Sequence, residues 1–165
     1  MGMQQVNDAI GGVTVTMSED WEIDGRKYTK GQTIKLVGKE ANDFLFRRDT
    51  DEFGSNMMRV SRQQDYLHAL IPQLKEAAKA DIGIVTKVYE ATSGYMYTNM
   101  SLPDIISLAS EALTKGYSFG DVQVLPGEYV EGKGHDEYNV DTDAVYEMVI
   151  QNYYVPVEET ADTNE

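Results

Sequence analysis

The stretch that most constrains this chain is residues 57–80, where two stripes of side chains repeat at the spacing of an α-helix. Turn chemistry precedes it, because Gly54 is followed by Ser55 and Asn56, and either short side chain is a suitable N-cap. The stripe predicted to face the core is apolar and holds Val60, Leu67, Ile71, Leu74 and Ala78. The stripe predicted to form an outward row of donors holds Arg59, Arg62, Gln63 and Tyr66.

The arginines of this chain are concentrated at the start of that predicted helix. Four of the five lie between Arg47 and Arg62, although the net charge of the chain is −14. A guanidinium group presents a planar fork of donors that suits phosphate or carboxylate, and the N-terminal turns of a helix also favour anions. The pattern therefore predicts a specific anion site. The alternative is a solvated helix face whose arginines form surface ion pairs with Asp49, Asp51 and Glu52.

Three segments, in the same order along the chain, resemble the LytR-CpsA-Psr family. The first is the Gly-Gly-Val segment within residues 6–15. The second has the order Gly-x-x-Ala-x-x-Phe at residues 38–44, a short arginine-containing segment, and then Arg-x-x-Arg-Gln-Gln at residues 59–64. The third is the Thr-Asn-hydrophobic-Ser segment at residues 98–101, before a predicted helix. Together they extend over nearly the whole chain.

The resemblance implies extracytoplasmic, membrane-anchored phosphotransferases, mostly of Gram-positive bacteria. Such enzymes transfer glycopolymers from a polyprenyl-pyrophosphate carrier to peptidoglycan, and Mg²⁺ assists. It also implies that the residues which hold the pyrophosphate and act in catalysis are Arg48, Arg59, Arg62 and Gln63, with Arg47 and Tyr66 as further ligand-binding residues. No metal ligand is assigned within this chain. The Mg²⁺ ligands are expected in the first half of the family domain, although Asp49, Asp51 and Glu52 form an alternative acidic group.

Two positions depart from the family pattern. Phe46 stands at the first arginine of the family's Arg-x-Arg segment, with Arg47 and Arg48 following, and Asn56 stands where many members have Asp. Phe46 and the expected absence of the first half of the family domain favour an alternative function, a non-catalytic module of the same ancestry that binds an anionic lipid or glycan. Members of such families have also been labelled transcriptional regulators.

Residues 1–155 are expected to form the second half of the family's catalytic domain, and residues 156–165 an acidic flexible tail. The chain alone is expected to be inactive and able to self-associate through an uncovered edge or apolar face. The acidic charge argues against nucleic acid as a partner. Without a run of 18 apolar residues, the chain as given is expected to be soluble, with any membrane anchor upstream.

Local patterns predict an α/β fold, with a layered mixed sheet flanked by helices. Strands are predicted at residues 13–17, 33–36, 95–98 and 122–126, and a hairpin or loop at 127–139. Further helices are predicted at 38–46, 82–91, about 101–113 and about 141–153. Residues 18–31 read as an irregular polar loop, whose Trp21 is expected to serve packing rather than sugar stacking.

Overall fold

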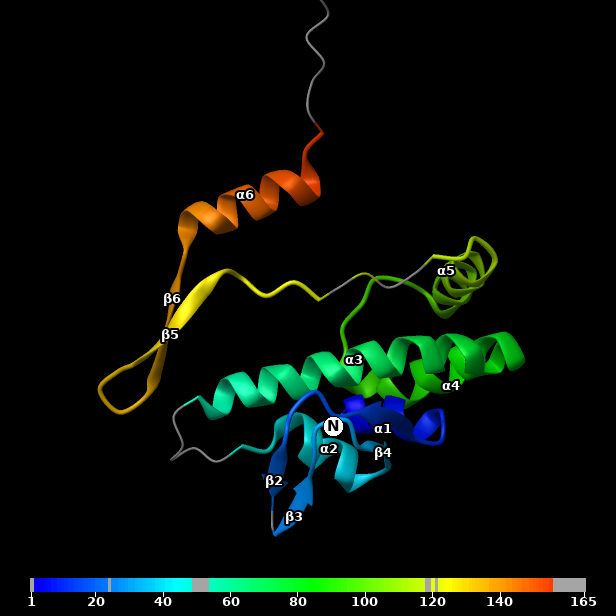
Figure 1. Cartoon of the computed structure of the whole chain (residues 1–165). Helices are drawn as coiled ribbons and strands as arrows, with labels where there is room; N and C mark the ends of the chain where they lie inside the picture. Colours follow the sequence, from blue (N-terminus) through cyan, green and yellow to red (C-terminus); the bar gives the residue numbers. More distant parts are fainter. Residues whose placement is uncertain (1, 24, 49–53, 118–119, 121, 156–165) are drawn as a thin grey trace, which may run out of the picture. The chain divides into compact units, whose positions relative to one another are not determined.

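The computed structural model describes residues 2–23, 25–48, 54–117, 120 and 122–155. The chain divides into two compact units, residues 1–121 and residues 122–165. Helices and small antiparallel strand pairs make up both units (Figure 1). The predicted α/β class, with small sheets flanked by helices, is confirmed.

The first unit places two strand pairs and a short helix beside one long helix (Figure 1). β1 pairs with β4 so that Val13 lies opposite Leu36, and β2 and β3 form a second antiparallel pair. Its elements follow in this order: α1 (Gly2–Ala9), β1 (Val13–Thr16), β2 (Trp21–Ile23), β3 (Arg26–Tyr28), β4 (Thr33–Leu36), α2 (Lys39–Phe46), α3 (Ser55–Ala80), α4 (Gly83–Thr92), η1 (Ser93–Tyr95) and α5 (Leu102–Thr114).

The turn between α1 and β1 requires glycine at position 12. Gly12 has a φ of 100°, and a Cβ there would lie 2.6 Å from Cγ1 of Val37 and 2.8 Å from the carbonyl oxygen of Leu36. Its backbone N–H donates to the carbonyl of Asn7 at 2.8 Å, which closes the end of α1. A larger residue would therefore force β1 away from the end of β4.

The long helix α3 begins differently from the prediction. Gly54 precedes it in the left-handed region, with φ 78°, and its carbonyl accepts from the N–H groups of Met57 and Met58. Ser55 is the first residue of the helix, and Gly54, which has no side chain, occupies the N-cap position. The predicted cap by Ser55 or Asn56 is wrong, because glycine supplies a left-handed turn that places the chain directly in the helix.

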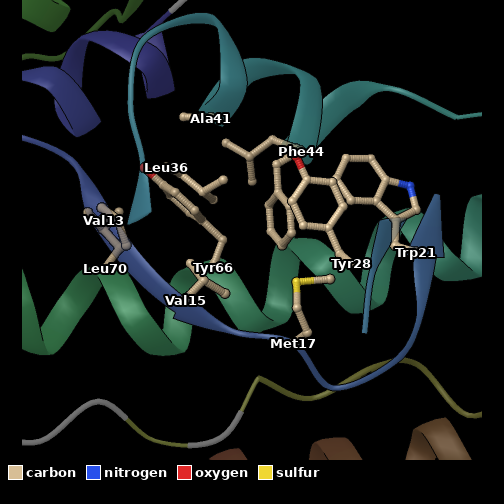
Figure 2. Packing of buried hydrophobic residues seen from close by; sticks show 11 residues of the cluster. Val13, Val15, Met17, Trp21, Tyr28, Leu36, Ala41, Phe44, Tyr66 and Leu70 are labelled. Atoms are coloured by element: carbon tan, nitrogen blue, oxygen red, sulfur yellow. The ribbon is translucent and has the colours of Figure 1, made fainter. Parts of the chain in front are cut away.

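The orientation predicted for α3 is wrong for part of the outward stripe, although Ala78 and Leu74 of the apolar stripe do face buried residues. Arg62 and Tyr66 from the predicted outward stripe are 1% and 0% exposed, and Leu70 continues the same buried face. Figure 2 shows Tyr66 and Leu70 beside Val13 and Val15 of β1. The reason is that both polar heads find buried partners, so the long apolar parts of these side chains can join the core.

Two buried polar side chains of this core, Asn7 and Tyr66, form a hydrogen-bond network. The hydroxyl of Tyr66 donates to Oδ1 of Asn7 at 3.0 Å, and Nδ2 of Asn7 donates to the carbonyl of Leu36 at 3.0 Å. Asn7 is 0% exposed. Burial is also the main cause that raises the pKa of Tyr66, with the nearby Asp8 carboxylate as a second cause. The hydroxyl is therefore a permanent donor that joins α3 to α1 and β4.

Residues 18–31, predicted as an irregular loop, contain the β2–β3 hairpin. Trp21 of β2 stacks on Tyr28 of β3 with ring centroids 5.1 Å apart, and its edge meets Phe44 of α2 at 5.4 Å. Glu40 of α2 accepts from the Tyr28 hydroxyl at 3.2 Å and from Arg26 at 3.3 Å. Trp21 is a packing residue, as predicted, and the hairpin is held by contacts with α2.

The later part of the first unit follows the predictions except at residues 95–98. The chain there leaves the short η1 turn and forms no strand, because no described segment pairs with it. The helix predicted near Ser101 is confirmed as α5. The Ser101 hydroxyl accepts from the N–H of Asp104, and Asp104 accepts from Ser101 in return, which lowers the pKa of the Asp104 carboxyl.

The second unit contains β5 (Gly127–Glu131), β6 (Asp136–Val140) and α6 (Thr142–Tyr153). The two strands form the predicted hairpin, and the Asp141 side chain caps the predicted last helix by accepting from Ala144 N–H at 3.0 Å. The strand predicted at 122–126 is wrong, since pairing begins only at Gly127. The predicted tail, residues 156–165, lies outside the described residues.

The buried network yields a stability prediction. Replacing Tyr66 by Phe removes the donor to Asn7 Oδ1 while keeping the ring, so an acceptor stays buried without that partner. We expect the free energy of unfolding to fall by about 1–3 kcal/mol. Urea denaturation followed by far-ultraviolet circular dichroism measures it. The control is Tyr97→Phe, since Tyr97 is fully exposed, and equal midpoints for the two variants would contradict this role of the hydroxyl.

Candidate anion-binding site

Two side chains of α3 bind the carbonyl groups at the end of α2. Nε of Arg62 donates to the Phe44 carbonyl at 2.9 Å, and Nη2 of Arg62 donates to the Arg47 carbonyl. Nε2 of Gln63 donates to the Leu45 carbonyl at 2.9 Å. The last carbonyls of a helix lack partners within the helix and carry partial negative charge, so a cation and an amide are suitable there. These bonds fix the segment that leads into the arginines.

The guanidinium of Arg62 also lies over an aromatic ring. Its central carbon is 4.3 Å from the centroid of Trp21. Burial lowers the pKa of Arg62 to about 10, the Glu19 carboxylate acts in the opposite direction, and the neighbouring Arg59 contributes further to the lowering. The group therefore remains charged at neutral pH. Arg62 is a fixed, buried cation rather than a mobile surface one.

A cavity of about 400 Å³ opens between the β2–β3 hairpin and the first turns of α3. Lys27, Arg48 and Arg62 give it three cations, and Asp20 and Glu22 give it two carboxylates. Ser55 also lines the cavity and is the first residue of α3. The positive end of the α3 dipole therefore lies at the same place as the cations. An anion with several oxygens, such as a phosphate ester, suits this combination.

The six site residues predicted from the sequence do not all meet at this cavity. Arg48 and Arg62 line it. Gln63 holds the end of α2, and Tyr66 lies in the core. Arg59 donates to Oδ1 of Asn56 at 2.5 Å. The exposed Arg47 offers its carbonyl to Arg62. The predicted alternative of ion pairs with Asp49, Asp51 and Glu52 lies outside the described residues.

The hairpin wall of the cavity was missed in the sequence. Lys27, Tyr28 and Thr29 belong to or follow β3, and Asp20 and Glu22 flank Trp21 at the start of β2. A signal was present, because Asp24-Gly25 is a dipeptide typical of tight hairpin turns. Gly25 indeed has a φ of 75°. The flanking strands are three residues each, too short for alternation to be recognised.

A second cavity of about 560 Å³ is lined almost entirely by apolar side chains of α3, α4 and α5. On α3 it is lined by Ile71, Leu74 and Ala78, members of the stripe predicted to face the core. Ile71 follows Arg62 by nine residues, which is about two and a half helical turns. The apolar cavity therefore lies on the opposite face of α3 from Arg62 and does not continue the anion-binding cavity.

Possible metal ligands are sparse in the described structure. Among residues 2–23, 25–48, 54–117, 120 and 122–155, no three His, Asp or Glu side chains come close enough together to hold a metal ion. Two carboxylates line the anion-binding cavity, and both already have partners. Asp20 accepts from the backbone N–H of Lys30 at 2.7 Å, and Glu22 pairs with Lys27 at 3.2 Å.

Comparison with known proteins defines the class. The family model of the LytR_cpsA_psr family matches residues 1–152. The match extends over most of the chain, so this protein belongs to the LytR-CpsA-Psr family, as the three sequence segments had indicated. A comparison with curated proteins gave no match. No helix within the described residues combines the length and the apolar character needed to cross a membrane.

Solved structures support the fold. TagV of B. subtilis is similar with a TM-score of 0.66 and 20% identity, over 94% of this chain and 62% of TagV. TagU of B. subtilis is similar with a TM-score of 0.57 and 21% identity, over 90% of this chain and 58% of TagU. A protein of Enterococcus faecalis described as a transcriptional regulator has a TM-score of 0.67 and 17% identity, over 91% of this chain and 54% of its own. The chain thus spans about three fifths of these structures.

The contacts of Arg62 predict that it supports the fold as well as the cavity. In Arg62→Gln, the Phe44 and Arg47 carbonyls lose their charged donor and Trp21 loses the cation above it. We expect the free energy of unfolding to fall by about 2–4 kcal/mol. The matched variant is Arg48→Gln, which removes an exposed cation of the same cavity and should change stability by less than about 0.5 kcal/mol. Equal urea midpoints for both variants would show that Arg62 does not hold the end of α2.

Proposed function

We propose that this chain is part of a cell-wall glycopolymer phosphotransferase. In this proposal the anion-binding cavity holds the pyrophosphate of a polyprenyl-pyrophosphate-linked glycan, whose polymer is transferred to peptidoglycan. The observation that carries it is the convergence of Arg48, Arg62 and the N-terminus of α3 on one cavity. Membership in the LytR-CpsA-Psr family supports the choice of substrate class.

The proposed reaction needs little covalent chemistry from the protein. A hydroxyl of the acceptor forms a bond to the phosphorus next to the glycan, and the anhydride bond breaks. The lipid phosphate leaves with the electron pair of that bond, and the proton of the hydroxyl passes to a base or to water. Catalysis of such a transfer rests on positioning and on stabilising the charge that builds up around the diphosphate.

The predicted site residues take different parts in this proposal. Arg48 is exposed at the cavity and contacts the diphosphate directly. Arg62 presents a fixed positive charge to the cavity and, through the Arg47 carbonyl, holds the backbone that carries Arg48. Gln63 acts as a positioning residue through the Leu45 carbonyl. Arg47, Arg59 and Tyr66 are kept as supporting residues, since they do not line the cavity in the described part of the chain.

Mg²⁺ is part of the proposal and would neutralise phosphate charge when bound. This ion commonly uses one or two carboxylates together with phosphate oxygens and water. The described residues assemble no group of three ligands. In this proposal its ligands are phosphate oxygens and carboxylates outside the described residues, as the family resemblance implies. The extracytoplasmic, membrane-anchored location implied by the family belongs to the same proposal.

The second candidate function is a non-catalytic module that binds an anionic lipid or glycan. Phe46 favours it, because this side chain ends α2 and is 41% exposed at a position where the family pattern has arginine. A transfer assay separates the two functions. The chain, and a longer version that contains the first half of the family domain, are each incubated with a lipid-linked glycan, peptidoglycan and Mg²⁺. Because the chain alone is expected to be inactive, transfer of the glycan by the longer version supports the phosphotransferase, whereas binding of the donor without transfer by the longer version supports the module.

The cavity yields a binding prediction. Replacing Arg48 by Gln removes a charge-assisted contact, and we expect the affinity for farnesyl pyrophosphate to fall at least about tenfold. Trp21 is the single tryptophan of the chain and lines the cavity, so its fluorescence reports binding directly. The charge-matched control is Lys133→Gln in the second unit, where the exposed lysine lies outside the cavity. Unchanged affinity in the Arg48 variant would remove the cavity from the proposed function.

A further inference from the structure

We infer that Lys27 of the β2–β3 hairpin is a third cationic ligand of the diphosphate, and that Glu22 competes with the diphosphate for it. The inference rests on the proposed function, because it adds a residue to the same cavity. Sequence patterns gave no role to Lys27, which lies in a segment predicted to be an irregular loop. It lines the cavity together with Arg48 and Arg62.

The backbone on both sides of Lys27 is held in place. Arg26 and Tyr28 both bind the carboxylate of Glu40 on α2, at 3.3 Å and 3.2 Å. Tyr28 also stacks on Trp21. Lys27 therefore stands on a short strand that is anchored to the helix carrying the arginine segment. A cation on such a support is placed before a ligand arrives, which lowers the entropy lost on binding.

The present partner of Lys27 is a weak competitor. Nζ of Lys27 lies 3.2 Å from Oε2 of Glu22, and the two side chains are 76% and 55% exposed. These residues are also direct cross-strand partners in the hairpin. An ion pair this open to water contributes little, about 0–1 kcal/mol. A diphosphate, which carries several negative charges, can therefore displace Glu22 from Lys27 at little cost in free energy.

Lys27 determines whether the lining of the cavity has a net positive charge. Among the described residues, this lining has three cations and two carboxylates, a net charge of plus one that would be zero without Lys27. The carboxylates differ in how they are held. Asp20 accepts from the backbone N–H of Lys30 at 2.7 Å, whereas Glu22 is paired with Lys27. An anion that binds Lys27 must therefore displace Glu22. This displacement is what opposes the binding of the anion.

The test uses two substitutions with opposite expected effects. Lys27→Gln should weaken binding of inorganic pyrophosphate and of farnesyl pyrophosphate about fivefold or more, because one charge-assisted contact is lost. Glu22→Gln should strengthen binding of both about twofold to fivefold, since Lys27 is released from its competitor. Binding is measured by Trp21 fluorescence and by isothermal titration calorimetry. Both effects should shrink as salt is raised, because the two side chains are exposed.

The controls separate local from overall charge. Lys30→Gln removes a lysine close to the hairpin that does not line the cavity, and Glu128→Gln removes a carboxylate in the second unit. Arg48→Gln serves as the positive control for the cavity. Opposite shifts for the Lys27 and Glu22 variants, with Lys30 and Glu128 variants like the wild type, support the inference.

Three other results overturn the inference, and they can be distinguished from one another. If the wild type binds and Arg48→Gln weakens binding, but Lys27→Gln leaves it unchanged, the cavity is the site and Lys27 is no ligand. If Lys30→Gln weakens binding as much as Lys27→Gln, the effect is one of overall charge and the inference also falls. If the wild type itself binds neither pyrophosphate nor farnesyl pyrophosphate, the proposed function fails, and the role of Lys27 fails with it.

Discussion

The guanidinium group of Arg62 joins three elements that are otherwise separate in the chain. It donates to carbonyls at and just beyond the end of α2, belongs to α3, and lies over Trp21 of the β2–β3 hairpin. Burying a cation is strongly unfavourable unless its donors and charge are matched. Two carbonyls, an aromatic face and the carboxylate of Glu19 provide that match. Together with Gln63, which joins α3 to α2, and Glu40, which joins α2 to the hairpin, this interaction holds the three elements around one cavity.

The sequence predicted those parts of the fold that local patterns determine. The helices α2 to α6 and the strands β1 and β4 follow from periodicity and from caps such as Ser101 and Asp141. What failed depends on distant partners. The outward direction predicted for Arg62 and Tyr66 was wrong because these side chains are polar by type but are satisfied by Phe44 and Asn7, far away in sequence. The hairpin was missed because its strands are only three residues long and part of its support comes from Glu40 and Phe44 of α2.

The same reasoning explains what could be predicted of the candidate site. Clustering of arginines pointed to Arg48 and Arg62, which do meet at one cavity. This clustering could not distinguish them from Arg59 and Gln63. Arg59, Arg62 and Gln63 share one face of the predicted helix, and Arg48 lies just before that helix. Only the tertiary contacts show that Gln63 binds the end of α2 and that Lys27, some twenty residues upstream of Arg48, lines the same cavity. Sequence spacing indicates chemistry on one element, whereas a cavity is built from several.

A chain of net charge −14 can still bind an anion. The affinity for an anion depends mainly on the charges that contact it, whereas its rate of approach also depends on more distant charges. The cations of the cavity and the end of α3 act at contact distance, where solvent and salt screen them least. Among the described residues, Asp20 and Glu22 are the carboxylates that line the cavity, and at physiological ionic strength the interaction of exposed charges is screened over about 8 Å. The acidic surface therefore slows the approach of an anion more than it weakens the bound state. The burial of Arg62 favours the bound state further, since it fixes the charge at the cavity. The side chain would not have to reorganise when the proposed ligand binds.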